Sequence, residues 1–167
     1  MIITETKRLI VEEAVISDAN FFLHLLNSPN WLQYIGDRKI ESEEAASQYI
    51  ITNITKSYNN NGYGLCKLTT KEEKIPVDIC GFVKRDYLAQ PDLGFALLPQ
   101  FERNGYAYEA AKTLLEYGFG IIRFSAVFAI TTIENIKSSA LLLKLGFQES
   151  GIIRPDITLP PVLLYSI

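Results

Sequence analysis

The chain has 167 residues, enough for one domain with a sizeable hydrophobic core. Sixteen basic and nineteen acidic residues give a formal net charge of -3, which argues against a nucleic-acid-binding protein. No apolar run approaches the length of a membrane span. The first residues lack the pattern of a signal peptide, so we expect a cytoplasmic protein.

The first half of the chain predicts a strand, two helices and a β-hairpin. Ser17-Asp18 and the acidic run after Ile40 suit helix N-termini, where a side-chain oxygen or a negative charge is favourable. A charged segment between two apolar runs indicates the hairpin. The expected elements are a strand over residues 8–13, a helix from 17 to about 27, a loop over 31–40, a helix from 41 to about 58, and strands over 63–69 and 77–84.

The second half alternates strands and helices. Apolar residues at Ala107, Ala110, Ala111 and Leu114 have helical spacing. A later helix is apolar nearly all round and is therefore expected to be buried. The expected elements are strands over 92–98, 125–132, 147–153 and 162–167, and helices over 106–121 and 136–145. Together they predict a single mixed α/β domain over residues 1–167.

Two residue types that often carry chemistry are scarce. Cys66 and Cys80 are the only cysteines, and their spacing is typical of reduced core thiols rather than of a metal site, a disulfide or a nucleophile. His24 is the only histidine and lies in an apolar helical stretch. A histidine-rich metal site is excluded, and no Gly-x-Ser-x-Gly elbow accompanies His24, so we interpret it as structural.

The junction between residues 98 and 107 carries the strongest chemical signal. A strand ends, a polar turn follows, and a helix begins whose first amides have no partner within the helix and can bind an anion. Gly105 allows close approach of the backbone, and Arg103 adds positive charge. By itself the pattern also fits an ordinary turn. It is neither a Walker loop nor a Gly-x-Gly-x-x-Gly fingerprint.

The whole chain resembles the GNAT acetyltransferase superfamily, and within it the ribosomal-protein-alanine N-acetyltransferase-like branch. Each matching segment is modest, but all occur in order along the chain at the spacing of the family. The segments are Thr4 to Val11, Tyr34-Ile35-Gly36-Asp37-Arg38, Asp92-Leu93-Gly94-Phe95, Asn104 to Ala110, Asn135 with Ser138, and Lys144-Leu145-Gly146-Phe147.

The resemblance implies a fold and a cosubstrate. The fold is a single GNAT-like domain, α/β or α+β, with a mixed, mostly antiparallel sheet flanked by about four helices. Two central strands, here 92–98 and 125–132, splay apart into a V. Acetyl-CoA is the implied cosubstrate, with its pantetheine arm in the gap, and no metal is implied.

The resemblance also implies roles for individual residues. Ala96, Leu97 and Leu98 pair with the pantetheine, and the Ala96 amide donates a hydrogen bond to the thioester carbonyl. Asn135 and Ser138 contact the pantetheine or the departing sulfur. The amides that hold the pyrophosphate are those of Arg103, Asn104, Gly105, Tyr106 and Ala107.

The implied general base is Asp92, which stands where several members of the superfamily have a glutamate. Aspartate is one methylene shorter, which favours proton transfer through a water molecule. The alternative is a solvated acid at the start of a strand. For Ser138 the alternative to a catalytic acid is a helix-capping or cofactor-contacting residue.

Two positions depart from the pattern of the superfamily. Glu102 replaces the usual Gln or Arg before the pyrophosphate turn and is a poor neighbour for phosphate. Leu142 replaces the tyrosine that protonates the thiolate in many members, which leaves Ser138 as the candidate acid. Residues that could line the acceptor side, or lie on the surface, are Tyr34, Asp37, Arg38, Arg85 and Asp86.

These observations predict an acetyl-CoA-dependent N-acetyltransferase that transfers the acetyl group directly to a primary amine. The acceptor is a protein N-terminus or a small molecule, and the sequence does not choose between them. The alternative is a non-catalytic CoA-binding or interaction module on the same fold. We expect no nucleic-acid or membrane partner, and either a monomer or a homodimer.

Overall fold

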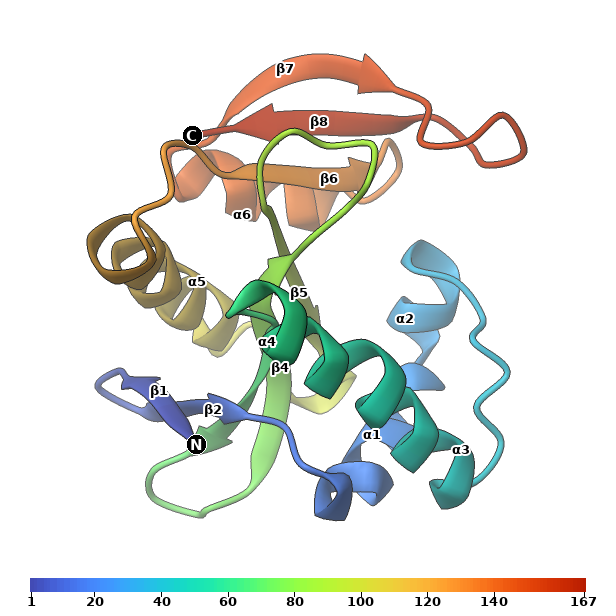
Figure 1. Ribbon diagram of the computed structural model, residues 1–167, viewed down its shortest axis with the longest axis vertical. Helices are drawn as coiled ribbons and strands as arrows, with labels where there is room; N and C mark the ends of the chain where they lie inside the picture. Colours follow the sequence, from blue (N-terminus) through green and yellow to red (C-terminus); the bar gives the residue numbers. More distant parts are fainter.

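The computed structural model describes residues 1–167, which form one eight-stranded sheet with helices on both faces (Figure 1). The strand order is β1-β2-β3-β4-β5-β6-β8-β7, and only β5 and β6 are parallel. The strands are β1 (Ile2–Glu5), β2 (Leu9–Glu13), β3 (Leu65–Thr70), β4 (Pro76–Val83), β5 (Asp92–Leu97), β6 (Phe128–Thr132), β7 (Gln148–Ile153) and β8 (Val162–Ser166). The predicted fold class is confirmed.

Six α-helices join these strands, and one of them was not expected. They are α1 (Ala19–Leu26), α2 (Pro29–Tyr34), α3 (Glu43–Tyr49), α4 (Lys56–Asn61), α5 (Tyr106–Tyr117) and α6 (Ile136–Lys144). The prediction of a loop over 31–40 is wrong at its start, because α2 begins at Pro29, whose ring favours the first helical turn. No helix is long and apolar enough to cross a membrane.

The helix expected from residue 41 to 58 runs from Glu43 to Asn61 with a change of winding in its middle. Ser42 caps its start by accepting the Ala45 amide, and Ile50–Thr55 forms a π-helical segment between α3 and α4. Within this segment, Thr52 and Asn53 donate side-chain hydrogen bonds to carbonyls four residues earlier. Such bonds compete with the backbone ladder and favour a local change of winding.

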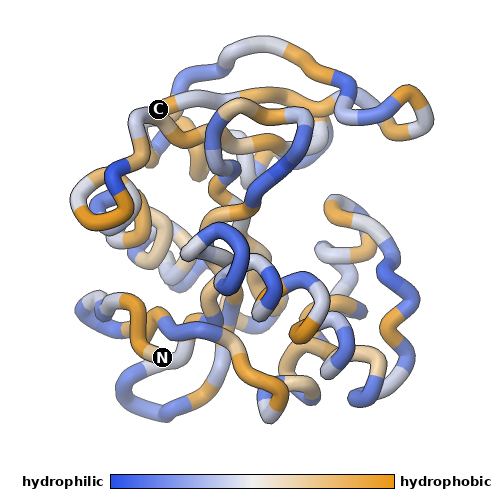
Figure 2. Tube along the Cα trace, viewed as in Figure 1, coloured by the Kyte–Doolittle hydropathy of each residue, from blue (hydrophilic) through white to orange (hydrophobic).

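Two apolar clusters sandwich the first five strands. One cluster packs α5 against the sheet through Ala110, Ala111 and Leu114. The other packs α1 to α4 on the opposite face, where Phe22 and Ile50 meet Ile79 of β4. Figure 2 shows that the hydrophilic stretches lie largely in the connecting loops and at helix ends. Cys66 and Cys80 are buried free thiols, as expected for core residues, and they lie opposite each other on β3 and β4.

Helix α6 is more exposed than its composition predicts. Only Leu142 is buried, whereas Ile136 and Leu143 are 71% and 56% exposed. The prediction of a buried helix is therefore wrong. The sheet beyond β5 contains only three strands, so α6 has a narrow surface on which to pack.

Asp78 of β4 is a buried carboxyl group without a full set of partners. Its side chain is 0% exposed, Oδ1 accepts the amide of Ile79, and Oδ2 has no hydrogen-bond partner. Burial raises the pKa of Asp78 well above its usual range, and the Ile79 amide opposes this only in part. The folded protein therefore binds this proton more tightly than the unfolded chain does.

We expect Asp78→Asn to stabilise the protein at pH 8 by about 1–3 kcal/mol, because a neutral amide replaces a buried carboxylate whose charge has no partner. The stabilising contribution of Asp78 is complete below the unfolded pKa of about 4 and is lost as pH rises through the raised folded pKa. Urea unfolding at pH 5 and pH 8 measures the free energy of unfolding of the parent and of the variant. The fall in stability between these values should be smaller in the variant, and Glu73→Gln in the exposed turn is the control. A less stable Asp78→Asn at pH 8 contradicts the interpretation.

Candidate functional site

Asp92 lies where the sheet divides. β5 and β6 share a single register pair, Asp92 with Phe128, and the Phe128 amide donates to the carbonyl of Pro91. The next amide of β6 in line, that of Ile130, donates to Asp92 Oδ1 at 3.1 Å. A side chain therefore accepts the hydrogen bond that a carbonyl of β5 would accept in a continued parallel ladder. Beyond this point the two strands separate, which is the predicted V.

The carboxylate of Asp92 is also paired with a cation. Arg85 Nε donates to Oδ2 at 2.5 Å, and the Asp92 side chain is only 2% exposed. Burial raises the pKa of Asp92, while the charge of Arg85 and the hydrogen bonds from Arg85 and Ile130 oppose the rise. The alternative of a solvated surface acid is wrong, because both oxygens are engaged inside the protein.

The register of β5 corrects the predicted backbone donors. Leu98 donates its amide to Val77 of β4, and the bonds of an antiparallel strand alternate between its two sides. The backbone amides of Ala96 and Leu98 therefore point toward β4, whereas the amides of the odd-numbered residues of β5 point toward the gap. The prediction that the Ala96 amide meets the thioester does not fit this register. Phe95 and Leu97 present their amides to the gap, and no sequence signal could have shown this, because the pairing of β5 with β4 decides it.

The turn before α5 presents a run of free backbone amides. Residues 103–108 donate no backbone amide to any acceptor within the protein, and the first amide bound in this helix is that of Glu109. Arg103 and Gly105 have φ angles of 65° and 77°, so the chain passes twice through the left-handed region. Alternating conformations of this kind turn successive amides toward a common centre, which suits an anion. All five predicted pyrophosphate residues lie in this run.

A polar network that the sequence did not reveal anchors this turn. Glu109 accepts the Thr6 hydroxyl at 2.6 Å, the Arg8 amide at 2.9 Å and Arg8 Nε at 2.7 Å. The Arg8 guanidinium also lies 4.6 Å from the centre of the Tyr106 ring. The connection between β1 and β2 is thereby fastened to the first turns of α5.

Glu102 does not project toward the free amides as an unpaired charge. Lys137 Nζ of α6 lies 2.8 Å from Glu102 Oε2, and the side-chain amide of Asn30 in α2 donates to Oε1. Glu102 departs from the family pattern, but Lys137 neutralises its negative charge. Glu102 thus links the turn before α5 to both α2 and α6.

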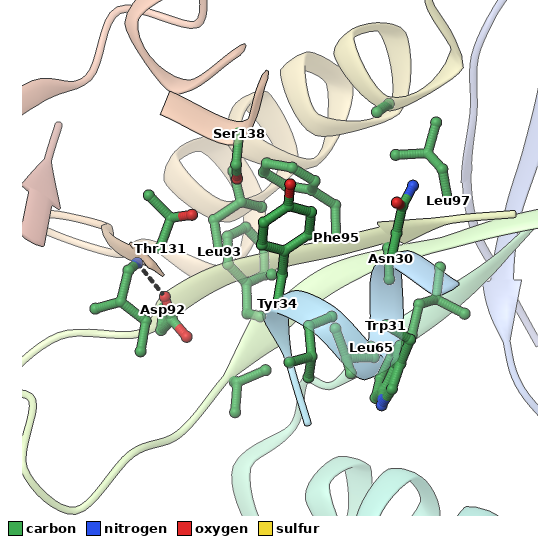
Figure 3. Close-up of a pocket in the computed structure, with 18 of the residues that line it drawn as sticks. Asn30, Trp31, Tyr34, Leu65, Asp92, Leu93, Phe95, Leu97, Thr131 and Ser138 are labelled. Carbon is green, nitrogen blue, oxygen red and sulfur yellow. Dashed lines mark hydrogen bonds between the residues drawn. The ribbon is translucent and has the colours of Figure 1, made fainter. Parts of the chain in front are cut away.

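The start of α6 lies beside the gap, with Ser138 and Phe95 both lining the same cleft (Figure 3). Asn135 caps the helix by accepting the amide of Ser138 at 3.1 Å. The Ser138 hydroxyl makes no hydrogen bond and lines the cleft. Leu142 is 1% exposed and belongs to the core, so its position offers no group to the gap.

The gap opens into a cleft of about 1260 Å³ that extends from α5 and α6 to α2, α3 and α4. Of the predicted acceptor-side residues, Tyr34, Arg38, Arg85 and Asp86 line this cleft. Asp37 does not, because it pairs with Lys39 at the surface. Tyr49 was not predicted. Burial raises its pKa, while the nearby charges of Arg38 and Arg85 oppose the rise.

This architecture is found in a known family. The model for the acetyltransferase (GNAT) domain matches residues 8–148. The chain belongs to the GNAT acetyltransferase family. A curated relative, the uncharacterized N-acetyltransferase YoaA of Bacillus subtilis, is 30% identical over 158 residues, which cover 91% of this chain and 86% of the relative.

Solved structures of other GNAT proteins share the fold. A ribosomal-protein-S5-alanine acetyltransferase from Vibrio fischeri has a TM-score of 0.81 at 16% identity, covering 98% of this chain and 94% of the other. A chimera of the spermidine N-acetyltransferase SpeG from Vibrio cholerae and hSSAT has a TM-score of 0.77 at 18% identity, covering 95% of this chain and 94% of the other. These TM-scores show a shared fold, and at identities of 16% and 18% they leave the acceptor open.

We expect Glu109→Gln to lower the melting temperature by about 2–4 °C, the shift for a loss of about 1 kcal/mol in a chain of this size. The amide replaces an acceptor oxygen with a donor that faces Arg8. Burial would raise the pKa of Glu109, but the bonds from Thr6 and Arg8 outweigh it, so the pKa is lowered. This contribution is present above the unfolded pKa and is lost as pH falls through the folded pKa.

Thermal unfolding at pH 7 measures the change, with Glu116→Gln on the same helix as the control, because Glu116 is exposed and makes no ion pair. Equal melting temperatures for the two variants contradict an anchoring role of Glu109.

Proposed function

We propose that this GNAT protein is an acetyl-CoA-dependent N-acetyltransferase that transfers the acetyl group directly to a primary amine. One observation carries the proposal: the turn with free amides at residues 103–108 lines, through Arg103, Gly105, Ala107 and Tyr108, the same cleft as Phe95 and Leu97 of β5. The first set suits a diphosphate, and the second suits an extended amide chain and a carbonyl. A CoA thioester contains these groups in this order.

The residues around the turn fit the phosphates of CoA. The amides of Arg103, Asn104, Gly105, Tyr106 and Ala107 would hold the pyrophosphate. Arg103 and Lys144 both line the cleft and supply positive charge, and Lys144 lies 4.5 Å from the centre of the Tyr108 ring. Because Lys137 neutralises Glu102, its carboxylate does not oppose the binding of an anion.

The backbone of β5 would orient the thioester. Phe95 and Leu97 are the proposed partners, in place of Ala96 and Leu98, because their amides face the gap. An amide directed at the carbonyl oxygen stabilises the negative charge that develops there during attack. Bound acetyl-CoA supplies an activated acetyl group: its new bond to nitrogen forms, the bond to sulfur breaks, and the electron pair leaves on sulfur. The proton that the nitrogen still loses on becoming an amide passes to that sulfur, so that the products are the amide and the free CoA thiol.

Asp92 is the proposed proton acceptor. An ammonium group must lose a proton before it attacks, and Asp92 is the carboxylate at the vertex of the gap. Its side chain is nearly covered and both oxygens already accept hydrogen bonds, so a water molecule would carry the proton from the amine. Ser138 would place its free hydroxyl near the departing sulfur, and Asn135 would hold that turn of α6.

The decisive experiment combines CoA binding with turnover. Calorimetry measures the affinity for CoA, and the release of free thiol in the presence of acetyl-CoA and a panel of primary amines measures transfer. For Asp92→Asn we expect CoA affinity within about threefold of the parent and a loss of about 100-fold or more in kcat, the contribution of general base catalysis. Glu72→Gln, in the exposed turn after β3, is the control.

Because Asp92 also joins β5 to β6, a pH profile separates its two roles. Proton acceptance predicts that the acidic limb of kcat/KM disappears in Asp92→Asn while the variant remains folded. Unchanged turnover in a folded Asp92→Asn contradicts the base assignment. CoA binding without turnover of any amine by the parent favours the non-catalytic module, and no CoA binding at millimolar concentration contradicts the proposed function as a whole.

A further inference from the structure

The part of the cleft formed by α2 to α4 and the loop between β4 and β5 is unusually basic for this chain. This part, the acceptor half, is lined by four cations and two carboxylates, a net charge of +2, whereas the whole chain carries -3. The charged residues are Arg38, Lys56, Lys84, Arg85, Asp86 and Asp92. Its positive charge is therefore local and cannot follow from the average composition.

Most of these cations are free of partners within the protein. Arg85 pairs with Asp92, but Arg38, Lys56 and Lys84 make no ion pair. The one carboxylate of the acceptor half without an ion pair is Asp86. A polycationic acceptor would meet three unpaired positive charges here, and like charges at close range disfavour binding.

The three free cations come from different parts of the chain. Arg38 follows α2, Lys56 begins α4 directly after the π-helical segment, and Lys84 follows β4. Figure 2 shows the segment after α2 and the beginning of the β4–β5 loop as hydrophilic stretches. The charges of Arg38 and Arg85 both act on Tyr49, so these two side chains lie near one another, and Lys56 and Lys84 line the same cleft. Independent elements thus contribute the same sign of charge to the lining of one cleft.

We propose that the acceptor is a small amine that also carries an anionic group, a carboxylate or a phosphate, held by Arg38, Lys56 and Lys84. This inference rests on the proposed acetyltransferase function and names its class of substrate. The anion would be held in the acceptor half while the amine points toward Asp92 and the gap. The acetyl transfer itself is unchanged. The cations select the substrate because each forms charge-assisted hydrogen bonds that a neutral or cationic acceptor cannot replace.

The test compares matched pairs of acceptors in the thiol-release assay. Phosphoethanolamine against ethanolamine tests the phosphate, and glutamate against its diamide tests the carboxylate. Spermidine and a Lys/Arg-rich peptide with a free N-terminus represent cationic acceptors. We expect the anionic member of at least one pair to have a kcat/KM about tenfold or more above its partner and above both cationic acceptors, the ratio for one charge-assisted bond.

Variants of the acceptor half then assign the effect to named residues. Lys56→Gln and Lys84→Gln should each raise KM for the best anionic acceptor about tenfold with little change in kcat, since they remove binding rather than chemistry. The affinity for CoA should stay unchanged. Lys56→Glu should reverse the preference toward spermidine. Lys74→Gln, in the exposed turn between β3 and β4, is the matched control.

The possible results separate this inference from the proposed function. A higher kcat/KM for spermidine or the basic peptide than for every anionic acceptor overturns the inference and leaves the acetyltransferase intact. Equal values within both matched pairs, or KM unaffected in all the lysine variants, also overturn it. No thiol release with any acceptor, despite CoA binding, overturns the proposed function and the inference together.

Discussion

The hydrogen bond from the Ile130 amide to the Asp92 side chain is the interaction on which the site depends. A parallel pair of strands normally continues until one strand ends, because each amide finds a carbonyl on its neighbour. Here a carboxylate takes the place of that carbonyl after one register pair, so β6 can leave β5 without abandoning its amide. The backbone of β5 beyond Asp92 is then free on the side of the gap.

The Asp92 carboxylate also connects the point where β5 and β6 separate to the acceptor half of the cleft. Arg85 compensates the charge of the buried Asp92 carboxylate, and a buried carboxylate without such a partner would be costly. The loop that carries Arg85 also carries Lys84 and Asp86. Sheet opening, the proposed proton acceptance and the proposed acceptor binding therefore involve adjoining residues, and a change at one of them is expected to affect the others.

Cross-links between distant segments hold the other end of the cleft. Arg8 and Glu109 fasten the β1–β2 connection to α5, and Lys137 and Asn30 hold Glu102 between α6 and α2. The turn before α5 has left-handed residues and unpaired amides, which by themselves do not stabilise a conformation. These polar contacts hold the turn in its conformation. They also compensate the charge of Glu102 beside the turn that we propose to bind an anion.

The sequence by itself determined the order of the elements, the family and the turn at Gly105, because local periodicity and a short motif carry that information. It could not decide whether α2 forms, how exposed α6 is, or whether the Ala96 amide points toward β4 or toward the gap, since these depend on neighbours distant in the chain. Only the tertiary structure showed that Asp92 is enclosed by Arg85 and Ile130, and that Arg38, Lys56 and Lys84 meet in one cleft. Charge at a site depends on which segments the fold brings together, and a net charge of -3 cannot reveal a basic pocket within it.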